Sequence, residues 1–298
     1  MIEQPIEDIY LIELPQPRKG YESFIGSWVL RRDPMTVLVD PGPRSTIPLL
    51  LQSLETLEIE TLDMILLTHI HIDHAGGTGL LLERYPEAAV ICHPKGIEHL
   101  INPERLWENT KKVLGDLAGM YGSIAAVPAS RIRFQEIIDV GAASIRVLMT
   151  PGHAAHHLSF QIDDILFAGE ALGVYYQFDK NWYLRPATPP VFRPDVYRQS
   201  IFKLADLDVC HLCFGHYGYS SNVQAIFDTA RDQLERWLDV VEMHVASGKI
   251  KSTSQILKTL LKKDPILTAY PKLPRSVQAR ERYFCQNSIT GMLGAVSG

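Results

Sequence analysis

The chain has 298 residues, and its 29 lysine and arginine residues against 34 aspartate and glutamate residues give a formal net charge of −5. Hydrophobic residues make up 46% and charged residues 21%, proportions that exclude a disordered chain and are typical of a globular protein. The acidic balance weighs against a dedicated nucleic-acid binder, because neutralising phosphates requires a surplus of basic residues.

Cysteine content and the start of the chain indicate the compartment. Four cysteines are too few for a disulfide scaffold of this size. Residues Met1–Pro15 carry acidic side chains where a secretory leader would have a basic stretch, and no apolar run approaches the roughly 18 residues that cross a bilayer. We therefore expect a cytoplasmic protein without a membrane partner. Eleven histidines are many for this length, and their positions carry the functional argument.

The first two thirds of the chain mix short strand-like runs with helical patterns, which favours a layered α/β or α+β fold. Helical spacing is predicted over Ile47–Leu57, Thr78–Tyr85 and Pro103–Tyr121. Strands are predicted at Ile9–Leu14, Trp28–Leu30, Thr36–Val39, Met64–Leu67, Ala89–Cys92, Ile132–Phe134, Ser144–Met149, Leu158–Ile162 and Ile165–Ala168.

The segment Leu172–Pro194 combines many aromatic residues with four prolines and shows no clear period. This composition predicts an irregular loop. The aromatic side chains would either fix the loop to the protein surface or form one wall of a ligand cleft.

From Ser220 the pattern becomes helical. Apolar residues recur every three or four positions over Val223–Val245, and further helices are predicted over Ser252–Leu261 and from Ser276 towards Ile289. We therefore expect a catalytic domain over residues 1–219 and a helical subdomain over residues 220–298.

The most informative segment has the sequence THIHIDHAGG and follows the buried-type strand Met64–Leu67. His69 and His71 alternate along an extended backbone, so their imidazoles point the same way, Asp73 continues the alternation, and His74 breaks it at a turn. Imidazole and carboxylate together suit zinc, iron or manganese. Such a loop can present two groups of ligands to two adjacent points.

Three further candidate ligands each follow a predicted strand. His153 lies in the turn-forming run Thr150–His153, Glu170 ends the run Leu166–Glu170, and His216 ends the run Cys213–His216. A rigid sheet fixes residues at its strand ends, so these positions are suited to a preorganised site.

The His-x-His-x-Asp-His run resembles the signature of the metallo-β-lactamase superfamily, and the later histidines and acid follow in that family's order. The resemblance covers roughly residues 1–220. It implies an α+β fold, a four-layer αββα sandwich with a dinuclear metal site at one edge. The helical tail is similar to the C-terminal helices of glyoxalase II, which help to form a substrate cleft.

The resemblance also implies roles for single residues. Glu170 would bridge the metals, and Asp40 would support the metal loop. Separately from the resemblance, His157 lies four residues after His153, and from this position we expect it to orient either a ligand or the loop. Glu170 departs from the family's usual aspartate, so it could bridge, bind one metal only, or reach past both. The first metal would be held by His69, His71 and His153, and the second by Asp73, His74 and His216.

The implied chemistry is hydrolysis of an ester-like bond, with a thioester or a lactone as the substrate class. Two divalent ions, zinc foremost and iron or manganese otherwise, would generate a hydroxide that attacks the carbonyl while Asp73 orients it. A second interpretation is a mononuclear iron enzyme that oxidises a persulfide. A third is a metal-binding protein without catalysis.

Substrate contacts are the least specific part of the prediction. Tyr175, Tyr176 and Tyr217 are candidate donors to a developing oxyanion, as in the lactonases of the superfamily. We expect a small-molecule substrate, and a homodimer is one arrangement left open. Basic residues of the tail would either form a solvated helical face or bind an anionic thiol carrier. They are Lys249, Lys251, Lys258, Lys262, Lys263, Lys272, Arg275, Arg280 and Arg282.

Overall fold

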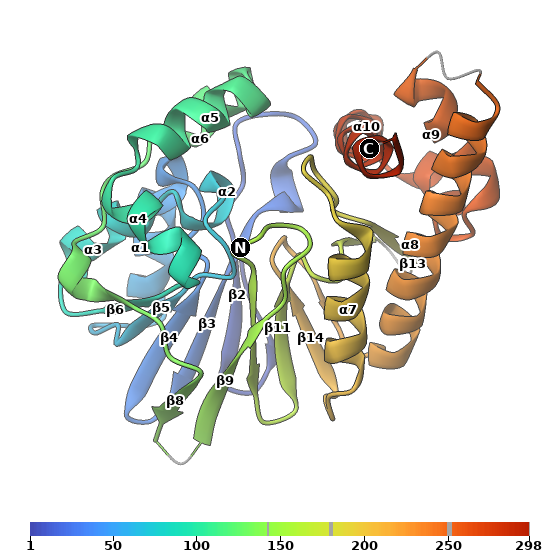
Figure 1. Cartoon of the computed structure of the whole chain (residues 1–298). Helices are drawn as coiled ribbons and strands as arrows, with labels where there is room; N and C mark the ends of the chain where they lie inside the picture. The colour runs from blue at the N-terminus through green and yellow to red at the C-terminus, as the bar shows by residue number, and fades with distance from the viewer. Residues whose placement is uncertain (142, 179–180, 249–251, 298) are drawn as a thin grey trace.

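The computed structural model of the chain describes residues 1–141, 143–178, 181–248 and 252–297. Two mixed sheets pack face to face, and helices cover the outer face of each sheet (Figure 1). The predicted α+β fold, a four-layer αββα sandwich with C-terminal helices, is confirmed.

The first sheet has its strands in sequence order. Strands β1 to β4 are antiparallel, and β4 to β7 are parallel. Their bounds are β1 (Ile2–Ile6), β2 (Ile9–Glu13), β3 (Gly26–Arg32), β4 (Met35–Val39), β5 (Met64–Leu66), β6 (Ala89–Ile91) and β7 (Ile132–Arg133).

The second sheet has the order β15-β14-β11-β10-β9-β8, in which only β11 and β14 are parallel. A separate antiparallel pair is formed by β12 (Val174–Phe178) and β13 (Asn181–Arg185). The second-sheet strands are β8 (Ile137–Val140), β9 (Ala143–Met149), β10 (Leu158–Ile162), β11 (Ile165–Gly169), β14 (His211–Phe214) and β15 (Tyr219–Ser220).

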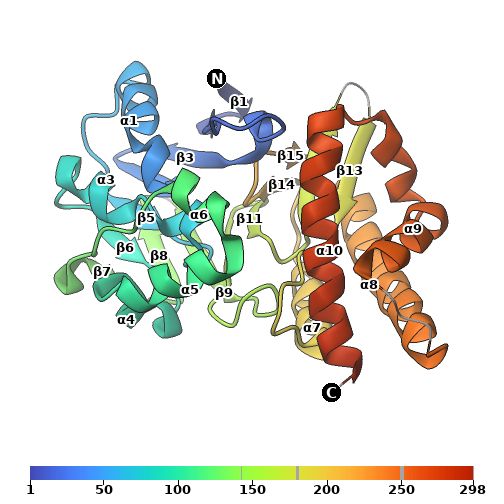
Figure 2. The same cartoon turned by 90° about the horizontal axis from the view of Figure 1, so that it is seen from above.

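Helices α1 to α6 lie on the side of the first sheet, and α7 to α10 lie on the side of the second (Figures 1 and 2). Their bounds are α1 (Ile47–Thr56), α2 (Ile72–Ala75), α3 (Thr78–Arg84), α4 (Pro94–Ile101), α5 (Glu104–Leu114), α6 (Asp116–Tyr121), α7 (Pro194–Ala205), α8 (Val223–Ala246), α9 (Thr253–Lys263) and α10 (Arg275–Ser297).

Alternation along the strands explains the four layers. In β4, Val37 and Val39 pack between the two sheets, whereas Leu38 packs against the helices of the first sheet. In β11, Phe167 faces the other sheet and Leu166 faces the C-terminal helices. Successive side chains of a strand point to opposite faces, so each sheet supplies apolar side chains to two cores.

Parallel pairing aligns the strand ends that carry the candidate ligands. Val39 pairs with Leu66, so Asp40 lies next to the segment that leads into the histidine run. Gly169 pairs with Phe214, so Glu170 and His216 follow neighbouring strands at the same edge. The carboxyl ends of parallel strands meet at one edge, which is where the family resemblance implies a metal site.

The structure corrects three expectations about local structure. The segment Leu172–Pro194 was predicted to be an irregular loop, but it contains the β12–β13 hairpin. The helix predicted over Pro103–Tyr121 is two helices, because Gly115 adopts a φ of +55° between α5 and α6. The last helix begins as predicted but continues to Ser297.

The C-terminal helices share a core with the second sheet. Side chains of α8 and α10, such as Trp237 and Ile289, pack in the same cluster as Leu166 and Leu212. The division at residues 219 and 220 stays a prediction. Within the described ranges, no helix is both long enough and apolar enough to cross a membrane.

Candidate metal centre

The first donor set is formed by His69, His71 and His153, whose ligand atoms lie within 4.8 Å of one another. His69 and His71 come from the loop after β5, and His153 comes from the loop after β9. Nε2 of His153 is 3.0 Å from Nδ1 of His71. The structure therefore brings together the three residues that the resemblance assigns to one metal.

The second donor set is formed by Asp73, His74 and His216, again within 4.8 Å of one another. Asp73 and His74 lie on the short helix α2, and His216 follows β14. Nδ1 of His216 is 3.2 Å from the Phe24 carbonyl oxygen, which can only accept a hydrogen bond, so Nδ1 carries the proton. Nε2 of His216 is left as the metal-binding atom.

Glu170 lies between the two sets. Its Oε1 is 2.5 Å from Nε2 of His216 and 3.5 Å from Nε2 of His74, whereas its Oε2 is 2.8 Å from Nδ1 of His153. A third candidate group, His69, His74 and Glu170, links one member of each set. Burial raises the pKa of Glu170, but His153 and His216 outweigh it and hold the pKa well below its usual value.

The two oxygens of the Glu170 carboxylate face different residues. Oε1 faces the ligand nitrogens of the second set, while Oε2 lies 2.8 Å from Nδ1 of His153, the nitrogen that does not face His71. The same Nδ1 is 3.0 Å from the Ala187 carbonyl oxygen, which places the proton of His153 on Nδ1.

Asp40 holds a histidine of each set in one tautomer. Its Oδ1 accepts the Thr68 backbone N–H (2.8 Å), and its Oδ2 accepts the Thr68 hydroxyl (2.6 Å) and Nδ1–H of His74 (3.0 Å). Because the Thr68 hydroxyl donates to Asp40, its oxygen must accept from Nδ1–H of His69 at 3.0 Å. Both histidines therefore present Nε2 to the site.

His157 fixes the backbone of Glu170. Its Nε2 accepts the Glu170 N–H at 2.9 Å, so Nδ1 carries the proton and donates to the Thr150 hydroxyl at 2.8 Å. Thr150 then donates to Ser159, and Ser159 donates to the Ala168 carbonyl. Gly169 has a φ of +58°, and a Cβ there would collide with Nε2 of His157. These buried hydrogen bonds fix the backbone position of Glu170, and with it the point from which the side chain extends.

Protonation states suit metal binding at the first set. Burial, together with the neighbouring imidazoles, holds the pKa of His69 and His71 well below its usual value, so both rings are neutral. Neutral imidazole is the form that ligates a metal. Burial also opposes a charge on His74, yet Asp73, Asp40 and Glu170 together hold its pKa well above its usual value.

Two buried nitrogens fit a metal centre directly. Among the described residues, Nε2 of His69 and Nε2 of His74 are buried polar atoms without a hydrogen-bond partner. Leaving such atoms unpaired costs about 1–3 kcal/mol each. Both point into the donor sets, and a divalent ion would satisfy both. The residues present therefore fit the metal site that the fold family implies.

The predicted tyrosines lie in three different settings. Tyr217 donates to a Glu3 carboxylate oxygen at 2.6 Å, so its hydroxyl is occupied by the N-terminal strand. Tyr175 is buried with its ring stacked on Phe214 at 4.6 Å between centroids. The half-buried Tyr176 packs beneath the Arg280 guanidinium, 5.2 Å from its ring centroid. The role of these three tyrosines as donors to an oxyanion stays a prediction.

The basic residues of the C-terminal tail also differ in their burial. Arg280 is 3% exposed and packs beside Phe24, whereas Lys258, Lys262 and Arg282 lie on exposed helix positions. Lys249 and Lys251 lie outside the described residues. Arg280 is therefore buried, whereas Lys258, Lys262 and Arg282 belong to a solvated helical face.

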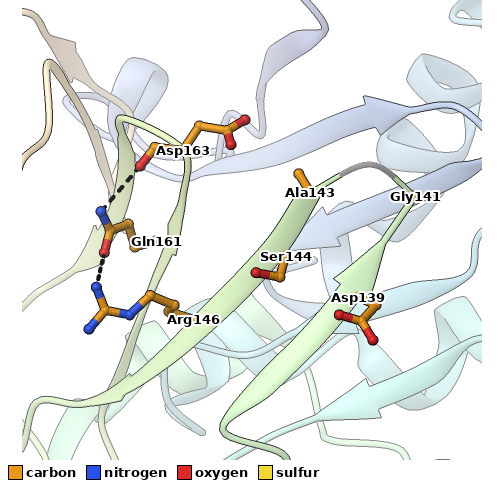
Figure 3. Close-up of a pocket in the computed structure, with 7 residues that line it drawn as sticks. All are labelled: Asp139, Gly141, Ala143, Ser144, Arg146, Gln161 and Asp163. Carbon is orange, nitrogen blue, oxygen red and sulfur yellow. Dashed lines mark hydrogen bonds between the residues drawn. The ribbon is translucent and has the colours of Figure 1, made fainter.

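A surface hollow lies at one end of the second sheet, at the start of β9. Figure 3 shows its lining, in which Arg146 donates to Gln161 at 3.0 Å and Gln161 donates to the Asp163 carbonyl at 3.1 Å. It flanks the start of β9, whereas His153 follows the end of that strand. Its polar groups pair with each other on the surface, away from the donor sets.

Comparisons with known proteins find relatives of this chain. A metallo-β-lactamase fold-containing protein of Sulfurisphaera tokodaii is 32% identical over 202 residues, which cover 65% of this chain and 73% of that protein. A hydroxyacylglutathione hydrolase of Xylella fastidiosa is 33% identical over 144 residues, which cover 47% of this chain and 42% of that protein. A hydroxyacylglutathione hydrolase of a Shewanella species is 26% identical over 275 residues, 88% of each chain.

Solved structures show the same fold. An archaeal metallo-β-lactamase superfamily protein from Sulfolobus tokodaii has a TM-score of 0.64 at 26% identity and covers 88% of this chain and 98% of its own. A B3 metallo-β-lactamase with an active-site glutamic acid has a TM-score of 0.58 at 21% identity, covering 84% and 92%. The family model of the metallo-β-lactamase superfamily matches residues 21–216, a span that includes both donor sets, and the chain belongs to that superfamily.

Proposed function

We propose that the protein is a hydrolase that uses two divalent metal ions, zinc foremost, to cleave an ester-like carbonyl bond. The observation that carries the proposal is the pair of donor sets that meet at Glu170, with unpartnered Nε2 atoms on His69 and His74. Divalent ions held there would polarise a carbonyl and lower the pKa of water towards 7.

The residues around the donor sets have separate tasks in this proposal. Asp40, with Thr68, holds Nε2 of His69 and of His74 towards the site. The Asp73 side chain is 17% exposed, against 1% for His74, so solvent reaches its carboxylate. We assign Asp73 the orientation of the attacking water through hydrogen bonding.

A thioester or a lactone is the substrate class that we favour. Two of the relatives are named hydroxyacylglutathione hydrolase, which supports a thioester. Phe24 stacks on the His216 ring at 4.2 Å between centroids, and Phe284 lies 5.5 Å from Phe24. Phe24 is 2% exposed, so this stack supports the His216 ring from behind and offers little surface to a substrate.

The test is hydrolysis by protein loaded with two equivalents of zinc, iron or manganese. The panel contains thioesters, lactones, β-lactams and phosphodiesters. We expect turnover of a thioester or a lactone, and loss of both metal content and turnover in His71→Ala. The matched control is His211→Ala, since His211 belongs to neither donor set and pairs with Tyr219. No turnover across the panel, or turnover by metal-free protein, would overturn the proposal.

One observation favours a second candidate, oxidation of a persulfide by a single iron. Oε2 of Glu170 lies against Nδ1 of His153, and Oε1 faces the nitrogens of the second donor set, so the carboxylate would bind a single metal there. Elemental analysis of protein purified without added metal, followed by oxygen uptake with glutathione persulfide, separates the candidates. One equivalent of iron with oxygen uptake supports the oxidation, and two equivalents of metal without uptake support the hydrolase.

A further inference from the structure

A further histidine lies next to the first donor set without belonging to it. His156 follows His153 in the same loop and is a member of neither donor set. Its half-buried ring has its centroid 5.6 Å from that of His71 and 6.3 Å from that of His69. His156 thus lies beside two ligands of the first set, and its contacts indicate what it does there.

The ring of His156 is bonded to the backbone between those two ligands. Its Nδ1 lies 3.4 Å from the backbone nitrogen of Ile70 and accepts the N–H of that residue. A ring nitrogen that accepts a hydrogen bond carries no proton, so the proton of a neutral His156 is on Nε2. Nδ1 is therefore committed to Ile70 and is not available to a metal.

The backbone on both sides of His69 is held by one segment. The Thr68 carbonyl accepts the Leu158 backbone N–H at 2.6 Å, and the Ile70 N–H is accepted by His156. These two groups belong to the peptide bonds that precede and follow His69. The main chain that carries this ligand is therefore fixed at two points, in addition to the hydrogen bond that orients its ring.

The side chain of Ile70 leaves its amide little freedom to find another acceptor. Ile70 is 1% exposed, and a Cβ on Gly96 of α4 would lie 2.8 Å from its Cγ2. Ile70 is thus packed closely against α4 while its N–H is held by His156. Removing the acceptor would leave a buried N–H unpaired, which is costly, so the loop would have to shift to bring that N–H to water.

We propose that His156 is a positioning residue that fixes the loop between His69 and His71 and thereby sets the affinity of the first donor set for its metal. Nδ1 performs this role as a hydrogen-bond acceptor, and the ring does not ligate the metal. The second donor set has its ligands on α2 and after β14, outside the segment that His156 holds. This inference rests on the metal centre of the proposed function and does not depend on which bond is cleaved.

Zinc affinity measured at one donor set at a time tests the proposal. His216→Ala leaves the first set complete, and His71→Ala leaves the second set complete. His156→Ala is added to each of these variants, and competition with a chromophoric chelator gives the affinity for the remaining zinc. The bond to Ile70 is longer than the usual length of about 2.9–3.0 Å, so we expect the first set to lose about tenfold, the low end for a residue behind a metal ligand. The affinity of the second set should stay unchanged.

Two amide variants separate the hydrogen bond from the bulk of the ring. In His156→Asn the carbonyl oxygen is as many bonds from Cβ as Nδ1 is, so it can accept the Ile70 N–H. In His156→Gln the carbonyl oxygen is one bond further from Cβ. We expect His156→Asn to recover most of the lost zinc affinity and His156→Gln to recover little. This comparison keeps the proposal testable if His156→Ala does not fold.

Hydrogen exchange of the Ile70 amide, followed by NMR in metal-free protein, reports the bond itself. Exchange should be faster than native in His156→Ala and His156→Gln, and close to native in His156→Asn. The matched control is His244→Ala, which removes a histidine whose Nδ1 donates to the Val240 carbonyl at 2.8 Å on α8. That variant should change neither the zinc affinity of either set nor the exchange of Ile70.

Three results would overturn the role of His156. The first is native zinc affinity of the first set in His156→Ala. The second is an equal loss at both sets, which would indicate a general loss of structure. The third is recovery by His156→Gln as complete as by His156→Asn, which would exclude Nδ1. Failure of the proposed function looks different, because protein whose zinc affinity depends on His156 but which hydrolyses nothing in the panel keeps the positioning role and loses the hydrolase assignment.

Discussion

Asp40→Asn changes the proton positions of two candidate ligands without changing the size of the side chain. In the native chain, Oδ2 of Asp40 accepts from both Thr68 and His74. If the amide nitrogen takes that place, it donates to Nδ1 of His74, and the proton of that ring moves to Nε2. The Thr68 hydroxyl is then free to donate to His69 and move its proton as well. Both metal-binding nitrogens would become blocked.

The opposite amide orientation is also costly. It would put the amide nitrogen against the Thr68 backbone N–H, which now donates to Oδ1 at 2.8 Å, and would leave two buried donors facing each other. An unsatisfied buried donor costs about 1–3 kcal/mol. Loss of one hydrogen-bond partner behind a metal ligand typically lowers metal affinity about 10–100-fold. We expect a loss of that size at each donor set.

Competition with a chromophoric chelator measures the two zinc affinities, and circular dichroism checks folding. The matched control is Asp63→Asn, since Asp63 accepts the Thr36 backbone N–H at 2.7 Å and touches neither donor set. It should lose stability and retain metal affinity. Folded Asp40→Asn protein that binds both equivalents with native affinity would refute the tautomer argument.

Three further changes test other contacts. Thr150→Val leaves Nδ1–H of His157 without an acceptor and should lower the unfolding free energy by about 1–3 kcal/mol in denaturant titrations; Thr150→Ser should lose less. The shorter side chain of Glu170→Asp cannot span both histidine contacts of Glu170, so this variant should bind zinc at least tenfold more weakly. A zinc affinity equal to or higher than the native one in chelator competition would contradict this. Burial lowers the folded pKa of His69, His71 and His157. The unfolding free energy of metal-free protein should therefore fall as the pH drops below about 6.5. An unfolding free energy that does not change over this pH range would contradict the prediction.

The fold and the donor residues could be predicted because their signals are local. The strand-like run Thr36–Val39 and the ligand run from His69 to His74 can be read from neighbouring positions alone, whereas the four-layer arrangement was implied by the family resemblance. His153, Glu170 and His216 each follow a strand, and their convergence was implied by the family resemblance. Parallel pairing of β11 with β14 is the physical reason that two of them meet.

The missed features depend on contacts between distant segments. The β12–β13 hairpin was hidden because the prolines that suggested a loop begin at Pro186, directly after the second strand. Thr150 and Thr68 contribute to the site through their hydrogen bonds to His157 and His69, which the sequence does not show. Arg280 looked like one of many basic residues of the tail, and only packing shows that it is buried.

Metal content tests the central claim most directly. Elemental analysis of purified protein after zinc loading should find two equivalents per native chain. His71→Ala and His216→Ala should each lose about one, because each removes a ligand from a different donor set. His211→Ala should keep both. Native protein that retains no zinc, or ligand variants that retain the full native content, would contradict a metal centre built from these two sets.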